Sequence, residues 1–209
     1  DWSSDVCSSD LDAAGTTDIQ GQPVPAGTHD PAEDVRFVQA EFDLWFADIL
    51  QRDWEKLVRE IEQKRAKLAD GIAARFTGLG IQSADVHRVL TRMGLEARPP
   101  SEWSPSDIES FARELRADSK PMIIAANKAD LCGNIDVSDR IAADDRTRVV
   151  PCSAETELLL RKAAKANMII YKTGGQGTFD LTPGVEVAPP QKKALDLASS
   201  ILSKIHDTG

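Results

Sequence analysis

The stretch that decides the fold is Met122-Ile123-Ile124-Ala125-Ala126-Asn127-Lys128-Ala129-Asp130, in which an apolar run leads into a polar turn. A short, continuous apolar run predicts a strand that is buried on both faces of a parallel sheet. Ligands of open α/β sheets bind just beyond the carboxyl ends of the strands. We therefore expect Asn127, Lys128 and Asp130 to lie at a ligand site.

A second motif follows a second short apolar run. Ser153, Ala154 and Glu155 come shortly after Val149-Val150, which predicts a neighbouring strand. If both strands belong to one parallel sheet, the two motifs lie at the same edge of it. A chance turn and a chance helix cap are the alternatives for each motif alone. Together and in this order, the motifs favour a nucleotide site.

The side chains of the two motifs suit guanine. The Asp130 carboxylate accepts hydrogen bonds only, so it can take the ring N1–H and the exocyclic amino group of guanine. Adenine would leave Asp130 desolvated and unpaired, at a cost on the order of 1 to 3 kcal/mol. Asn127 has both donor and acceptor atoms, which can bond to the O6/N7 edge of guanine and to the neighbouring backbone. The methylene stem of Lys128 is expected to cover the ring plane. The backbone N–H of Ala154 is expected to donate to guanine O6. The expected ligand is GTP or GDP, with Asp130 as the selectivity residue.

An all-helical block is predicted over residues 31–118. Apolar residues recur at spacings of three and four over 35–50 and again over 57–72. The charged outer face of the second stretch is typical of a helical hairpin or a short coiled coil. Ser83 is expected to cap a shorter helix, and Ser104-Pro105 to begin the last one. The residues expected on the buried face of the first helix are Val35, Val38, Phe42, Trp45, Ile49 and Leu50.

The remainder predicts a helix over 157–166, a loop, and an amphipathic stretch over 191–206. The glycine cluster at 174–177 has neither a lysine nor a preceding strand, so it is interpreted as a surface turn. No G-x-x-x-x-G-K-[ST] motif occurs anywhere in the chain. The phosphate loop, the Mg²⁺ ligand and the hydrolytic residues are therefore expected upstream, and no catalytic or metal-binding residue is assigned.

Composition indicates an ordinary soluble protein. Of 209 residues, 41% are apolar and 28% charged, and no apolar run is long enough to cross a membrane. The net charge of −9 argues against a generally basic surface that coats nucleic acid, and no DNA partner is expected, although a local basic face on one helix is compatible with this charge. Cys7, Cys132 and Cys152 show no paired spacing, so we expect reduced cytoplasmic thiols, with Cys132 and Cys152 as small buried residues. His29, His87 and His206 are expected in surface or capping roles.

The ends of the chain look unnatural. Residues 1–11 have no helical or strand period and resemble the translation of a sequencing-library adapter, so they are left out of the predicted fold. The chain is then expected to be interrupted at residue 11 or 12 and again near Gly209. Residues 12–30 are rich in Gly, Thr, Asp and Pro and predict a loop.

Three stretches resemble the Obg class of P-loop GTPases, most closely its YchF-like subfamily in the archaeal form. They are Asp12-Ala-Ala-Gly-Thr-Thr-Asp18, His29-Asp-Pro-Ala-Glu-Asp-Val-Arg-Phe37 and Pro151-Cys-Ser-Ala-Glu155. The resemblance implies a fragment: the second half of an α/β GTPase domain, interrupted by a coiled-coil-like helical insertion. It divides the chain into a GTPase-domain loop (12–30), the insertion (31–118), the second half of the GTPase domain (119–187) and a helix leading to a TGS domain outside the chain (188–209).

The resemblance further implies GTP hydrolysis with Mg²⁺ in a full-length parent that associates with the ribosome or ribosomal RNA, this fragment alone being inactive. One alternative is a helical ribosome- or protein-binding module with a structural nucleotide pocket. The other is an ATP-preferring YchF-type ATPase, since bacterial and eukaryotic relatives depart from Asn-Lys-x-Asp. Because this sequence keeps Asn127, Lys128 and Asp130, GTP is favoured.

Two features fit more than one interpretation. Asp12-Ala-Ala-Gly15 matches the Asp-x-x-Gly magnesium motif, but no switch-like segment follows it, so a loop role is favoured. Arg59, Lys64, Arg65 and Lys67 are compatible with contacts to RNA phosphates, as the resemblance implies, or with a solvated helix face.

Overall fold

The computed structural model describes residues 7–133, 141, 147–174 and 177–205. The chain forms two compact units. The helical unit consists mainly of Arg36–Ile123, and the α/β unit of Ser9–Val35 together with Ile124–Gly209. Each unit is described separately below.

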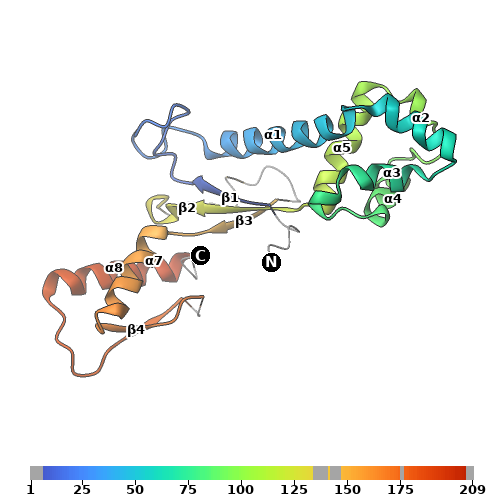
Figure 1. The fold of residues 1–209 in the computed structure, drawn as a ribbon. Coiled ribbons are helices and arrows are strands. Elements are labelled where there is room, and N and C mark those ends of the chain that lie inside the picture. The colour runs from blue at the N-terminus through green and yellow to red at the C-terminus, as the bar shows by residue number, and fades with distance from the viewer. Residues whose placement is uncertain (1–6, 134–140, 142–146, 175–176, 206–209) are drawn as a thin grey trace. The chain divides into compact units, whose positions relative to one another are not determined.

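Three strands form a sheet in the order β1-β2-β3 (Figure 1). They are β1 (Cys7–Asp12), β2 (Met122–Asn127) and β3 (Arg148–Pro151). Buried and half-buried residues alternate along β2. The two strands predicted from apolar runs are therefore confirmed, each extended by a residue or two.

The strands run parallel, with their carboxyl ends at one edge (Figure 1). Just beyond β1, the Ala13 N–H donates to the Asn127 carbonyl at 2.9 Å, and just beyond β3, the Cys152 N–H donates to the Ala126 carbonyl at 3.0 Å. Both bonds join residues at strand ends. This confirms the predicted α/β sheet and places the segments after the three strands next to one another.

Strand β1 corrects one expectation. It begins at Cys7, inside the segment 1–11 that was left out of the predicted fold. Its sequence, Cys-Ser-Ser-Asp-Leu-Asp, lacks an alternating apolar pattern, yet its backbone pairs with β2. Ladder hydrogen bonds are made by the backbone, so a strand beside a buried neighbour can form without the side-chain pattern that marks strands in a sequence.

The rest of the α/β unit follows β3. Helix α7 (Ala154–Lys165) is longer than predicted, and α8 (Pro189–Ile205) matches the amphipathic stretch. Between them, β4 (Ile169–Tyr171) and β5 (Phe179–Leu181) form an antiparallel hairpin where a loop was expected. The apolar core shared by these elements is made by Leu160, Ala163, Ile169, Leu195, Ala198 and Leu202.

The helical unit has five α-helices (Figure 1), joined in part by short 3₁₀ turns at 77–79 and 100–102. Its core contains stacked Phe46 and Phe76, with ring centroids 5.1 Å apart, and the aromatic series Trp54, Trp103 and Phe111. The helices are α1 (Pro31–Gln51), α2 (Trp54–Lys64), α3 (Leu68–Arg75), α4 (Ser83–Arg92) and α5 (Pro105–Ser119).

The predicted long second helix is wrong. The stretch 57–72 is divided between α2 and α3, because Arg65 adopts a left-handed conformation with φ 50° and ends α2. A Cβ on Gly71 would lie 2.7 Å from Ile61 Cδ1, so α3 packs tightly against α2. A glycine at the contact allows the two helices to fold back into one core.

Two further details differ from the prediction. Val35 and Leu50 are buried as predicted, but Trp45 is 46% exposed, and the next two residues, Phe46 and Ala47, occupy the core in its place. Helix α4 is capped by Gln82 with Asp85, not by Ser83. The cap of α5 is confirmed: Ser104 Oγ accepts the Asp107 N–H, and Pro105 opens the helix.

None of the described helices is long and apolar enough to cross a membrane.

Candidate functional site

The site begins where β2 ends. Asn127 is the last residue of β2, and its side-chain Oδ1 accepts two backbone N–H groups, from Lys128 at 2.8 Å and from Ala154 at 3.0 Å. The second bond joins the turn after β2 to the first residue of α7. The structure therefore brings together the two motifs that the sequence places 27 residues apart.

Backbone bonds hold the same two segments. The Ala129 N–H donates to the Cys152 carbonyl at 3.1 Å, and Ala129 opens a 3₁₀ turn that ends at Leu131. Lys128 reaches this turn through a left-handed conformation, φ 62°. Such a conformation costs a residue with a Cβ some free energy, and at a strand end it reverses the chain sharply.

Asp130 lies in this 3₁₀ turn with a half-buried side chain. Within the described part of the chain, its carboxylate has no hydrogen-bond or ion-pair partner. Glu155, on the first turn of α7, is exposed and equally unpaired with the described residues. The Asp130 carboxylate keeps its acceptor capacity for a ligand that presents N–H groups.

Ser153 and Ala154 position the start of α7. Ser153 is fully buried, and its Oγ accepts the Thr156 N–H at 3.3 Å and contacts Thr156 Oγ1 at 2.8 Å. Ser153 is therefore the N-cap of α7, a structural role. The Ala154 N–H, expected to donate to a base oxygen, donates to Asn127 Oδ1 in this structure. A base oxygen at this position would share that hydrogen.

A polar cluster that the sequence did not reveal surrounds the Lys128 ammonium. Lys128 Nζ donates to Asp12 Oδ2 at 2.8 Å and to Thr16 Oγ1 at 2.7 Å. Asp12 Oδ2 also accepts the Thr16 N–H, the Thr16 hydroxyl and the Thr17 hydroxyl at 3.0, 2.6 and 2.9 Å. We call Asp12, Thr16, Thr17 and Lys128 the Asp12 cluster. Its signal in the sequence is an aspartate followed by threonines four and five residues later, at the end of a strand.

The Asp12 carboxylate is ionised in this setting. Burial raises its pKa, but hydrogen bonds from Lys128, Thr16 and Thr17 and the positive charge of Lys128 outweigh burial and hold the pKa at about 2. All four donors reach Oδ2, while Oδ1 is buried without a partner among the described residues. An unsatisfied buried oxygen costs about 1 to 3 kcal/mol.

Gly15 fixes the loop that carries the Asp12 cluster. Its φ is +59°, and a Cβ there would lie 2.1 Å from the His29 carbonyl oxygen. The His29 side chain is 11% exposed and its Nε2 lies 2.8 Å from Asp34 Oδ1, a contact that raises the pKa of His29. His29 thus ties the loop to the start of α1. The loop role predicted for Asp12-x-x-Gly15 is consistent with this packing.

The other sequence features have structural roles where they are described. His87 is exposed beside Glu96, and His206 lies outside the described residues. Cys132 is buried, as expected, whereas Cys152 is half-buried, and burial raises the pKa of the Cys152 thiol. Among the described residues, no group of three or more His, Cys, Asp or Glu side chains is arranged to hold a metal ion.

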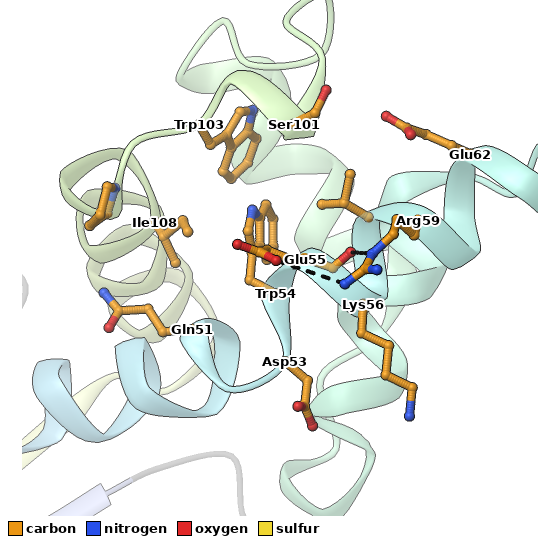
Figure 2. Close-up of a pocket in the computed structure, with 12 residues that line it drawn as sticks. Gln51, Asp53, Trp54, Glu55, Lys56, Arg59, Glu62, Ser101, Trp103 and Ile108 are labelled. Atoms are coloured by element: carbon orange, nitrogen blue, oxygen red, sulfur yellow. Dashed lines mark hydrogen bonds and ion pairs between the residues drawn. The ribbon is translucent and has the colours of Figure 1, made fainter.

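The helical unit contains a separate cavity of about 810 Å³ between α2 and the segment 101–108 (Figure 2). The rings of Trp54 and Trp103 lie on its wall, with centroids 5.3 Å apart. Glu55 and Arg59, on its rim, pair with each other at 3.8 Å. The cavity is lined by aromatic and charged groups but contains none of the residues of the two motifs.

A family model and two curated relatives match the chain. Residues 125–209 match the family described as Obg-like GTPase YGR210-like, G4 motif-containing domain. An uncharacterized GTP-binding protein of Methanocaldococcus jannaschii is 34% identical over 95% of this chain and 49% of its own length. One of Schizosaccharomyces pombe is 28% identical over 95% of this chain and 50% of its own length. The chain spans about half the length of these relatives.

A solved structure has the same fold. The crystal structure of a GTP binding protein from Pyrococcus horikoshii aligns with a TM-score of 0.69 and 34% identity, over 96% of this chain and 52% of that one. The α/β fold with a helical insertion is therefore one that a GTP-binding protein uses. Taken together, the family match and these relatives support a relationship between this chain and the Obg-like P-loop GTPases, with residues 125–209 similar to their G4 motif-containing domain.

Proposed function

We propose that the α/β unit binds a guanine nucleotide through its base, at the edge of the sheet where β2 and β3 end. The observation that carries the proposal is the bond from the Ala154 N–H to Asn127 Oδ1, which holds the two motifs together while the Asp130 carboxylate stays uncommitted. A rigid frame with one free acceptor is what base recognition requires, because the frame need not be ordered on binding.

Each residue then has a part in recognition. Asp130 accepts the N1–H and the exocyclic amino group of guanine, two donors that adenine does not present together on that edge. Asn127 faces the O6/N7 edge, and the Lys128 stem lies against the ring plane. Ser153 caps the helix that Ala154 begins, and Glu155 follows Ala154 in the first turn. The G4 motif-containing family match over 125–209 supports this assignment.

We further propose that this chain is the base-reading part of a longer GTPase that uses Mg²⁺ and hydrolyses GTP. The two relatives named as GTP-binding proteins are about twice as long as the matched region. The sequence contains no G-x-x-x-x-G-K-[ST] motif, so the phosphate loop and the hydrolytic groups would lie outside this chain. An ATP preference, as in YchF-type ATPases, is disfavoured by the unpaired Asp130 carboxylate, which adenine cannot satisfy.

The test is a titration of the ¹⁵N-labelled chain with GMP and with AMP, followed by amide chemical shifts. We expect GMP to shift the resonances of Lys128, Asp130 and Ala154 and to bind at least about tenfold more tightly than AMP. The matched control is Asp180→Asn, which removes an exposed carboxylate on β5, away from the motifs. Equal affinity for the two nucleotides would overturn guanine recognition.

A second candidate function is a binding role for the helical unit, with ribosomal RNA as the proposed partner. Lys64, Arg65 and Lys67 are exposed at the junction of α2 and α3, and within the described chain none of them has an ion-pair partner. Unpaired basic side chains on one short segment suit RNA phosphates, although the chain as a whole is acidic.

Cosedimentation with ribosomes at several salt concentrations tests this candidate. Replacing Lys64, Arg65 and Lys67 together by Gln should weaken binding and flatten its salt dependence, since fewer counterions are released. Replacing Lys192 and Lys193 by Gln on α8 is the control, because both are exposed lysines on the other unit. An unchanged salt dependence of the triple variant would rule out this segment as the RNA contact.

A further inference from the structure

The Asp12 cluster connects the loop after β1 to the base-reading turn after β2. Asp12 and Lys128 are 116 residues apart in the chain, and their side chains meet at 2.8 Å. The Thr16 hydroxyl lies between them, since it accepts from Lys128 Nζ at 2.7 Å and donates to Asp12 Oδ2 at 2.6 Å. The ammonium is therefore held by two oxygens from one loop.

This arrangement constrains the Lys128 side chain at both ends. Its Cα end is fixed by the left-handed backbone and by the bond from the Lys128 N–H to Asn127 Oδ1. Its Nζ end is fixed by Asp12 and Thr16. A free lysine side chain samples many rotamers, and ordering it on binding costs conformational entropy. A stem fixed at both ends has lost this freedom before a ligand arrives.

The two charged side chains of the Asp12 cluster, Asp12 and Lys128, form an ion pair and differ in their exposure to solvent. The Asp12 side chain is 16% exposed and that of Lys128 is 40% exposed, so the carboxylate lies beneath the more accessible lysine. The hydroxyls of Thr16 and Thr17 donate hydrogen bonds to Asp12 Oδ2 and keep this oxygen in place. Of the two charged groups, the lysine is the one a ligand could reach.

We propose that Asp12 is a positioning residue for guanine recognition, which holds the Lys128 ammonium so that the lysine stem forms a preset surface for the purine ring. This inference rests on the proposed function of the same site. Asp12 acts through Lys128 and need not touch the nucleotide. It therefore sets the affinity for a purine base, whereas Asp130 sets the choice of base.

The experiment is a double-mutant cycle in GMP affinity, measured by amide shifts of the 209-residue chain. Asp12→Asn should weaken GMP binding about tenfold, as expected when one charge-assisted bond that orders a ligand contact is lost. Lys128→Met keeps an unbranched stem without the ammonium. In that background Asp12→Asn should change GMP affinity by less than about twofold, because residues that act through one another are not additive.

Two further variants separate positioning from loop folding. Thr28→Val removes a hydroxyl bond to the Pro25 carbonyl in the same loop but leaves the Asp12 cluster intact, so GMP affinity should stay unchanged. Thr16→Val removes only the hydroxyl between the two charged groups and should give a loss of about threefold, even if Asp12→Asn fails to fold. The ¹⁵Nζ resonance of Lys128 gives a readout without nucleotide. The protons on Lys128 Nζ should exchange slowly with water in the wild type and rapidly in Asp12→Asn.

The outcomes are distinct. A tenfold loss that disappears in the Lys128→Met background supports the inference. An equal loss in both backgrounds overturns it, because Asp12 would then act without the lysine. GMP binding that neither Asp12→Asn nor Thr16→Val changes overturns the inference alone. A wild-type chain that does not bind GMP overturns the proposed function and the inference with it.

Discussion

Asn127 Oδ1 accepts the backbone N–H of Ala154 at 3.0 Å, and the same oxygen accepts the N–H of Lys128 at 2.8 Å. One side-chain oxygen thus joins the turn after β2 to the first turn of α7. Together with the backbone bond from the Ala129 N–H to the Cys152 carbonyl, this bond holds the two motifs side by side.

Asn127→Ala should loosen the contact between the two motifs, which the backbone bond from Ala129 to Cys152 would still join. It leaves two N–H groups without their acceptor, and because Ala154 is exposed to water we expect a modest loss of about 1 kcal/mol in unfolding free energy. GMP affinity should fall more than stability does, since the Lys128 and Ala154 segments lose their common anchor. Urea unfolding and GMP titration measure the two effects. Asn127→Asp, which keeps an acceptor oxygen, should retain the stability; an equal loss would show that the bond is not the cause.

The two motifs could be predicted as neighbours from the sequence because parallel strands end at one edge, and apolar runs mark buried strands well. The cap at Ser104, followed by Pro105, was also predictable, whereas the cap of α4 lies one residue before the predicted Ser83. The Asp12 cluster was not predictable, because it joins residues 116 positions apart. The sequence pattern around Asp12 is compatible with several kinds of loop, and only the folded structure shows that this loop contacts Lys128.

The helix break at Arg65 and three of the strands were also not predicted, for physical reasons of the same kind. The break at Arg65 lacks a glycine or a proline, so the apolar spacing continues through it although the helix does not. Strands β4 and β5 have three residues each, too few for an alternating pattern to be recognised. Strand β1 forms through backbone pairing with β2, which side-chain patterns do not report.

The stability of the α/β unit should depend on pH through Asp12. Its pKa in the folded chain is about 2, below the ordinary value of 3.8. A lowered folded pKa stabilises the fold above about pH 4, and this stabilisation is lost as the pH falls toward 2. The shift corresponds to about 2 kcal/mol. Urea unfolding of the wild type and of Asp12→Asn should show a stability difference that narrows from pH 6 to pH 2.5. A difference that is constant with pH would contradict the ionised state of Asp12.

Gly15 and Gly21 form a matched pair for testing the loop. Both have positive φ, 59° and 77°, but only at Gly15 would a Cβ meet the protein, 2.1 Å from the His29 carbonyl oxygen. Gly21→Ala should cost about 1 kcal/mol from backbone strain alone. Gly15→Ala should cost about 3 kcal/mol or more, because the His29 segment must move as well. Thermal unfolding compares the two, and similar losses would show that the Gly15 contact is not tight.

The cap of α5 should matter for the helical unit. Ser104→Ala removes the oxygen that accepts the Asp107 N–H and should lower the unfolding free energy by about 1 kcal/mol. Ser101→Ala is the control, because Ser101 is exposed in the preceding 3₁₀ turn and should change stability by less than about 0.5 kcal/mol. Urea unfolding followed by tryptophan fluorescence measures both, since Trp54 and Trp103 lie in this unit.

The central claim is that the uncommitted Asp130 carboxylate reads guanine. An asparagine at this position accepts one hydrogen bond and donates another, which suits xanthine, whose C2 carries an oxygen in place of the amino group. The most direct measurement is the affinity of the wild type and of Asp130→Asn for GMP and for XMP, by the same amide-shift titration. We predict that the wild type prefers GMP and that Asp130→Asn loses at least about tenfold in GMP affinity while gaining affinity for XMP. Unchanged GMP affinity in Asp130→Asn would contradict the claim.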